Sequence, residues 1–197
     1  TNTTNEDTLL LVNSASGVLV NDVDLSSPVS LSVTEVNGVG ASVGNEITLT
    51  SGALLTLRAD GSYDYDPNGQ FEGLTPTTDS FQYTVSDFTN STSATVTINV
   101  TNVNDAPELD LNGVGGDLNY TTTFTEDVSG AVSIVDPDVM ITDIDDSNTE
   151  SATITLTNVQ AGDVFAMTGT LPTGITVDPS STATNIILTG SATLADY

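Results

Sequence analysis

The chain has 197 residues, a length that suits one large domain or two domains of about 100 residues each. It carries 27 acidic residues and one basic residue, Arg58, so its formal net charge is −26 and nucleic acids and anionic membranes are poor partners. It has no cysteine, histidine or lysine, which excludes disulfide bonds, thiolate metal sites, and catalysis by histidine or by a lysine Schiff base. We expect no insertion into a membrane, because no run of about 20 apolar residues is present.

Apolar and polar residues in the first half of the chain alternate with the two-residue period of β-strands. Turn-forming pairs such as Asn37-Gly38 separate the strands. The predicted strands are Leu9–Val12, Val18–Val20, Val29–Val36, Ile47–Leu49, Ala53–Leu57, Ser62–Tyr65, Ser80–Ser86 and Ala94–Val100. So many short strands in about 100 residues are typical of a β-sandwich, whose core we expect Tyr63, Tyr65, Phe81 and Tyr83 to fill.

The segment Asn102–Pro107, called the joint below, follows the last of these strands. Its sequence is Asn-Val-Asn-Asp-Ala-Pro, so oxygen-bearing side chains stand shortly before a proline. We place a domain boundary in this segment and predict two domains, residues 1–104 and residues 105–197.

The second half of the chain repeats the plan of the first. Asn5–Thr8 is matched by Thr125–Val128, and Gly17–Asp24 is matched by Gly130–Asp138. Strands are predicted at Asn119–Phe124, Ala131–Ile134, Ala152–Leu156, Val164–Met167, Ile175–Val177 and Ile186–Leu188. The closing strands of the first half have no counterpart here. The predicted fold is therefore all-β, with two tandem Greek-key β-sandwiches, of which the second lacks C-terminal strands and exposes an unpaired edge.

Acidic residues form Asp-X-Asp steps at Asp22–Asp24, Asp136–Asp138 and Asp143–Asp145. Calcium binds six to eight oxygen atoms from carboxylates, amides and carbonyls, and such a step supplies two carboxylates on neighbouring positions. Aspartate is also a common turn residue, so a single step is equally consistent with a solvated loop.

The spacing of these residues points to the joint. Asp136 follows Asp105 by 136 − 105 = 31 residues, and Asp138 follows it by 33. If one strand leaves the joint and the next returns, both aspartates come back to it. The primary candidate ligands for Ca²⁺ are Glu6, Asp79, Asp87, Asn104, Asp105, Asp136 and Asp138. The secondary candidates are Asp22, Asp24, Glu126, Asp143 and Asp145.

Asn104–Pro107, Glu6 and Asp136–Asp138 resemble elements of cadherin-type repeats and of their bacterial cadherin-like relatives. In those repeats an Asn-Asp-X-Pro linker, an early glutamate and a later Asp-X-Asp step share calcium ions. Gly17–Asp24 and Asp79–Asp87 resemble sequence segments of the tandem repeats of large secreted (RTX-type) bacterial adhesins. The resemblance implies an array of cadherin-like or immunoglobulin-like modules joined by calcium. Asn102 replaces an aspartate of the animal pattern, which implies one or two ions.

From these features we expect a non-enzymatic, extracellular module, secreted or at the cell surface, whose partners are neighbouring repeats of the same chain. Calcium would neutralise carboxylates that otherwise repel one another at the joint, and would tie the units into a rod. The alternative is a module that binds a polysaccharide or an identical module on another cell. Aromatic residues make up only 5% of the chain, which argues against a catalytic or sugar-binding cleft.

Overall fold

The computed structural model describes residues 1–24, 30–73, 76–113, 117–125 and 130–197. Its contacts divide the chain into two compact units, Thr1–Asn104 (unit 1) and Asp105–Tyr197 (unit 2), and each is described by itself. Across the described residues the regular elements are strands and short 3-10 helices, which confirms the all-β prediction. No helix within these ranges is long and apolar enough to cross a membrane.

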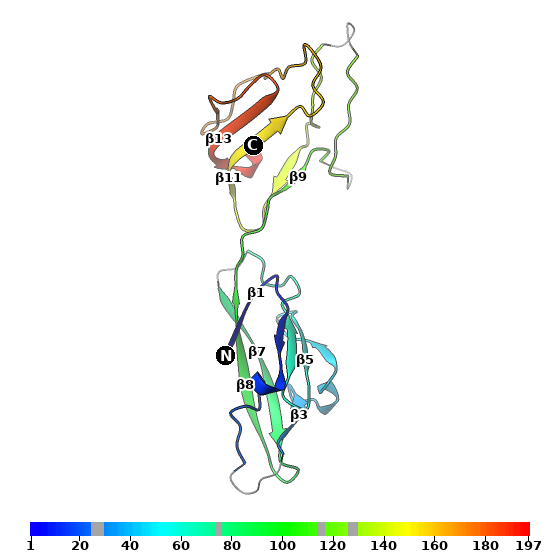
Figure 1. The fold of residues 1–197 in the computed structure, drawn as a ribbon, viewed down its shortest axis with the longest axis vertical. Coiled ribbons are helices and arrows are strands. Elements are labelled where there is room, and N and C mark those ends of the chain that lie inside the picture. The colour runs from blue at the N-terminus through cyan, green and yellow to red at the C-terminus, as the bar shows by residue number, and fades with distance from the viewer. Residues whose placement is uncertain (25–29, 74–75, 114–116, 126–129) are drawn as a thin grey trace. The chain divides into compact units, whose positions relative to one another are not determined.

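Unit 1 is a sandwich of two four-stranded sheets (Figure 1). The first sheet has the order β1-β8-β7-β3, in which β1 is parallel to β8 and the other neighbours are antiparallel. The second sheet has the antiparallel order β2-β6-β5-β4. The elements are β1 (Asn2–Asn5), β2 (Leu10–Val12), η1 (Ser14–Ser16), β3 (Ser32–Val36), η2 (Gly40–Ser42), β4 (Glu46–Thr48), β5 (Leu54–Leu57), β6 (Tyr63–Asp66), β7 (Thr77–Ser86) and β8 (Ser91–Thr101).

The core of unit 1 is formed by the side chains that alternate inward along these strands. The four predicted core aromatics, Tyr63, Tyr65, Phe81 and Tyr83, are each at most 4% exposed. Tyr63 and Phe81 meet edge to face with their ring centroids 5.4 Å apart, a favourable geometry for two aromatic rings. The prediction that these residues pack in the core is confirmed.

Two segments of unit 1 differ from the predicted strands. Val18–Val20 is a turn, in which the Val20 N–H donates to the Gly17 carbonyl at 3.3 Å. Val18 is 7% exposed, so this apolar run anchors a loop in the core instead of joining a sheet. Conversely, β1 was not predicted, because Asn2–Asn5 is polar and does not alternate. It forms a strand because β8 supplies its hydrogen-bonding partner.

Unit 2 contains two smaller sheets. β9 (Glu108–Asp110) and β10 (Met140–Thr142) form an antiparallel pair, and β11 (Asn148–Thr155), β13 (Asn185–Thr193) and β12 (Thr176–Val177) form a sheet in the order β11-β13-β12. The short helix η3 (Leu194–Asp196) follows. The predicted strands at Asn119–Phe124, Ala131–Ile134 and Val164–Met167 are absent from the described part of unit 2. A strand needs a ladder of hydrogen bonds to a neighbour as well as suitable residues. In Val164–Met167, for example, the Phe165 N–H donates to the Ala183 carbonyl at 2.8 Å, but no strand forms there.

Candidate functional site

The end of unit 1 that leads into the joint is built by β1 and β8. Asn2 lies opposite Ile98 and Asn5 lies opposite Thr101, so both strands run toward the joint. Glu6 follows β1, and its backbone N–H donates to the Thr101 carbonyl at 3.2 Å. Because β1 is only four residues long, it delivers Glu6 to the joint end of unit 1.

A turn at Asn5–Thr8 positions the side chains that follow β1. The Thr8 N–H donates to the Asn5 carbonyl at 3.3 Å, and the buried hydroxyl of Thr4 donates to the Thr8 carbonyl at 2.7 Å. Glu6 and Asp7 occupy the two central positions of this turn. Two successive carboxylates are therefore presented from a fixed backbone.

Glu6 is a charged residue placed in the interior, at 3% exposed. Its Oε1 accepts a hydrogen bond from the backbone N–H of Val103, in the joint. Within the described residues, Glu6 Oε2 and Asn5 Oδ1 are buried and accept no hydrogen bond. A buried acceptor without a partner costs about 1–3 kcal/mol, and more when it is charged. Two such oxygens side by side in sequence suit a hard cation such as Ca²⁺, which binds carboxylate and amide oxygens.

Asp7 and Glu72 form a second carboxylate pair in unit 1. Their carboxylate oxygens lie within 4.8 Å of each other. Phe71, 7% exposed, anchors the loop before β7 in the core, and Glu72 is the next residue of that loop. Like charges so close favour a bound cation. The sequence prediction missed this pair, because Glu72 lies in no acidic motif and only the fold brings it to Asp7.

The Asp79 carboxylate accepts hydrogen bonds from residues within unit 1. Its Oδ2 accepts hydrogen bonds from the Tyr65 hydroxyl at 2.9 Å and the Ser51 hydroxyl at 2.7 Å, and its Oδ1 accepts from the Ser80 N–H at 2.7 Å. Burial, together with the neighbouring carboxylate of Asp79, raises the pKa of Tyr65 far above its ordinary value. Both oxygens of Asp79 are thus engaged within unit 1, which indicates a structural role.

Asp87 lies away from the joint. It caps the β7–β8 hairpin, where its Oδ1 accepts from the N–H groups of Asn90 at 2.6 Å and Thr89 at 2.7 Å. These backbone hydrogen bonds lower the pKa of Asp87. The other end of the hairpin, where Thr77 pairs with Val100, is the end that leads to the joint. The expectation that Asp87 contributes to a site at the joint is therefore wrong, because β7 carries it to the opposite end of the sheet.

Asp22 and Asp24 belong to the loop that follows η1. The Tyr83 hydroxyl donates to Asp22 Oδ2 at 2.9 Å and to the Val18 carbonyl at 3.1 Å. Burial, helped by the contact with Asp22, raises the pKa of Tyr83 to about 12. Asp22 therefore holds a core tyrosine in place, and Asp24 lies half-buried just after it.

Unit 2 gathers a different pair of aspartates around Asp105. The Asp105 N–H donates to Asp145 Oδ2 at 2.6 Å, and Asp143 Oδ1 accepts from the Asp145 N–H at 2.9 Å. This loop follows β10, whose last residue, Thr142, pairs with Glu108 shortly after the joint. The acidic step that the fold brings to Asp105 is thus Asp143–Asp145, a secondary candidate.

Asp136 and Asp138 lie at the other end of the β9–β10 ladder. The Asp136 N–H donates to the Leu111 carbonyl at 3.0 Å, and Asp136 Oδ1 accepts from the Asp138 N–H at 3.0 Å. The chain does return toward the joint, as expected, but it does so along β10, which begins after Asp138. Their predicted place at the joint is therefore wrong. Glu126 lies outside the described residues.

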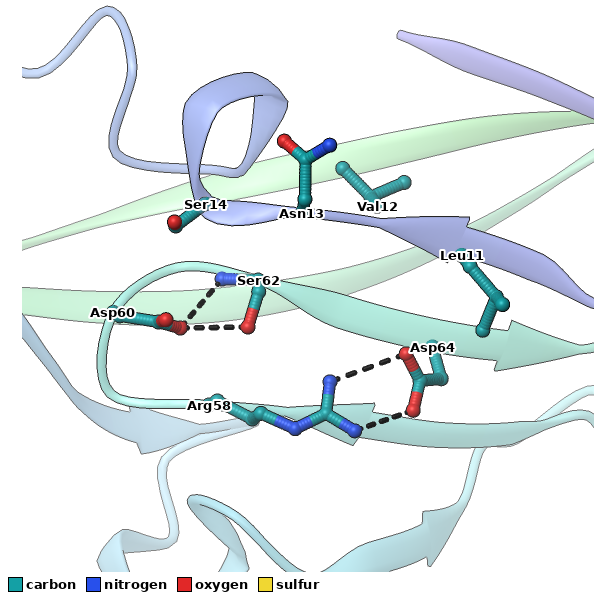
Figure 2. Close-up of a pocket in the computed structure, with 8 residues that line it drawn as sticks. All are labelled: Leu11, Val12, Asn13, Ser14, Arg58, Asp60, Ser62 and Asp64. Carbon is teal, nitrogen blue, oxygen red and sulfur yellow. Dashed lines mark hydrogen bonds and ion pairs between the residues drawn. The ribbon is translucent and has the colours of Figure 1, made fainter.

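Arg58 borders a surface depression of about 440 Å³ on unit 1 (Figure 2). Its guanidinium donates to both carboxylate oxygens of Asp64, with one of these bonds at 3.1 Å, and this contact lowers the pKa of Asp64. Asp60, on the same rim, accepts from the Ser62 hydroxyl at 2.6 Å. Arg58 and Asp64 are thus paired with each other, Asp60 is held by Ser62, and these contacts brace the β5–β6 hairpin.

Residues 1–102 match the family model of the bacterial cadherin-like domain, which spans unit 1 almost completely and just over half of the chain. No curated protein and no solved structure shows a significant match.

Proposed function

The chain belongs to the bacterial cadherin-like domain family, and we propose that it is a calcium-dependent spacer of a large extracellular bacterial adhesin. The family consists of structural and adhesive modules rather than catalysts. In this proposal the two units are neighbouring modules of an array, and Ca²⁺ at the joint limits the motion of one module against the next.

The observation that carries the proposal is the state of Glu6. It is almost fully buried, one of its oxygens is held by Val103, and the other accepts no hydrogen bond from any described residue. Asn5 Oδ1 is in the same condition. Native proteins rarely leave buried polar atoms unsatisfied, so each case calls for an explanation such as a bound ion. Asp7 and Glu72 form a separate pair of carboxylates in unit 1, and such a pair would also attract a divalent cation.

The contacts of Val103 suggest how an ion would stiffen the joint. β8 passes directly into the joint, and the hydrogen bond from Val103 fixes the second residue of the joint to Glu6. An ion on the remaining oxygen of Glu6 would hold the carboxylate and, through it, Val103. Asn104, the next residue of unit 1, carries a further amide oxygen. In unit 2 the backbone of Asp105 is already held by Asp145.

The net charge of −26 supports the same mechanism. Carboxylates that crowd together destabilise a compact state through mutual repulsion, and bound cations relieve it. With one basic residue in the chain, and that residue paired with Asp64, the neutralising charge has to come from solution. Extracellular calcium modules typically bind with dissociation constants of about 0.1–1 mM.

Small-angle scattering and thermal unfolding of the whole chain test the proposal. We expect about 10 mM calcium, ten times a millimolar dissociation constant, to raise the melting temperature relative to a sample in chelator. In the scattering experiment, calcium should narrow the distribution of interatomic distances. Magnesium at the same concentration should do less, because it demands a smaller octahedral site. An unchanged melting temperature and an unchanged maximum dimension would refute the proposed role.

Polysaccharide binding, the alternative considered from the sequence, has less support. Sugar sites commonly use exposed aromatic platforms, and Tyr63, Tyr65, Phe81 and Tyr83 are buried in the core. Phe88, at 83% exposed, stands on a hairpin turn and does not line the depression that Arg58 borders. A glycan array with calcium present would reverse this ranking if it returned strong binding to one defined glycan.

A further inference from the structure

The outer edge of β8 in unit 1 is only partly covered by the strands that the structure describes. β8 runs from Ser91 to Thr101 and pairs with β7 along one side. On its other side β1 covers Ile98–Thr101, and no described strand covers Ser91–Thr97. Residues Ser91–Thr95 are exposed. A sheet edge of this length presents a row of backbone donors and acceptors to solvent.

The direction of these backbone groups follows from the ladder on the covered side. Gln82 lies opposite Thr95, and its own N–H and carbonyl are bonded to Asn37 on the β3 side. Gln82 and Thr95 are therefore not hydrogen-bonded to each other, so the N–H and carbonyl of Thr95 point away from β7. By alternation, the backbone groups of Ser91 and Ser93 point outward as well.

The other edges of unit 1 carry the features that usually prevent association of strands. β2 and β4 are three residues long, and β4 begins with Glu46. β3 contains Glu35, and β1 is four residues long. Short strands and charged side chains are standard protection against edge-to-edge pairing. The uncovered part of β8 has neither, since Phe88–Asn104 contains no charged residue although the chain has 27 acidic ones.

We propose that the uncovered edge of β8, Ser91–Thr97, pairs antiparallel with the same edge of a second copy of this chain. An antiparallel arrangement is self-complementary, because Ser91 and Ser93 of one copy meet the outward-facing residues near Thr95 of the other. The neutrality of the segment identifies the occupant. A copy with a net charge of −26 can approach another only where carboxylates do not face each other, and this edge meets that condition.

Salt should act on this pairing in a characteristic direction. The contact itself is neutral, while the remaining surface of each copy is acidic and repels the other. Screening therefore strengthens the association, whereas it would weaken a contact made of ion pairs. Because the contact requires no calcium, it can be measured in chelator, where it does not depend on the calcium proposal.

Sedimentation equilibrium of the whole chain in chelator, from about 10 µM to about 1 mM, tests the pairing. We expect a monomer–dimer equilibrium that tightens as sodium chloride rises. Thr95→Pro removes an outward N–H and leaves the ladder to β7 intact, so it should raise the dissociation constant at least ~10-fold. Thr95→Val keeps the N–H and should leave it unchanged. A monomer at every concentration, or a dimer insensitive to Thr95→Pro, would overturn the proposal.

Disulfide trapping gives a second test that does not rely on proline. The chain has no cysteine, so a single introduced one reports on its own surroundings. Ala94→Cys should oxidise to a covalent dimer much faster than Thr78→Cys, an exposed position on β7 of the same sheet. Equal rates for the two variants would show that the copies do not meet at β8.

Discussion

Replacing Glu6 by glutamine separates the charge of this residue from its shape. The glutamine keeps an oxygen for the Val103 N–H, but a neutral hydrogen bond is weaker than a charged one by about 1 kcal/mol. It also replaces a buried charged oxygen that accepts no hydrogen bond from the described residues by an amide NH2 group; a buried neutral group without a partner costs about 1–3 kcal/mol, and a charged one costs more. We expect a net gain of about 1 kcal/mol in chelator, which is about 4–8 °C for a domain of this size.

The same substitution should remove most of the response to calcium. A ligand at 100 times its dissociation constant stabilises the folded state by about 2.7 kcal/mol, which corresponds to about 10–20 °C here. Glu6→Gln takes away the carboxylate on which the proposed site depends. The order of stability should therefore invert, so that the variant melts above the wild type in chelator and below it in calcium.

Near-ultraviolet circular dichroism follows unit 1 selectively, because the buried tyrosines Tyr63, Tyr65 and Tyr83 belong to it. Asp87→Asn is the matched control, since it makes the same change of charge at the distant hairpin. It should leave the calcium response of the wild type intact. A Glu6→Gln variant with the full calcium response, or one that melts below the wild type in chelator, would refute the reasoning.

Three further predictions concern the interior of unit 1. Asp79→Asn should lower the free energy of unfolding by about 1–2 kcal/mol in denaturant melts, because the hydrogen bond from Tyr65 loses its charged acceptor, and should leave the calcium response unchanged. Burial and the hydrogen bond to Asp22 raise the pKa of Tyr83 to about 12, so the neutral tyrosine stabilises the fold fully below the unfolded pKa of about 10, and this contribution is lost as pH rises through 12. Tyr83→Phe should flatten that alkaline loss in a pH series of melts. Leu55→Ala, at a position that is 0% exposed, should cost about 2–5 kcal/mol by denaturant melts, and a loss below 1 kcal/mol would show a loosely packed core.

The local pattern of the sequence was enough to predict the sandwich of unit 1. Alternation of apolar residues marks strands because successive side chains of a strand point to opposite faces. Tyr63, Tyr65, Phe81 and Tyr83 could therefore be assigned to the core before the fold was known, and they are buried there. The same reasoning failed at Val18–Val20, where an apolar run of similar strength anchors a loop.

The candidate ligands also show what a local sequence pattern predicts and what it misses. Glu6 could be found from a motif, but its position beside the joint depends on β1, a strand whose own residues give no signal of one. The spacing argument correctly expected a strand to return to the joint in unit 2. It selected Asp136–Asp138 because spacing alone does not show where a strand begins, and the register of β9 and β10 selects Asp143–Asp145 instead.

The sequence by itself determined the class of the fold, the composition of the core and the acidic character that makes a divalent cation a reasonable partner. These properties depend on residue type and on short-range periodicity, which a linear pattern contains in full. Only the tertiary structure decided which carboxylates meet, that Glu72 joins Asp7, and that no described strand covers the outer side of Ser91–Thr97 in β8. Such properties depend on contacts between residues far apart in the chain, and these contacts are settled by strand register and by burial of the core as a whole.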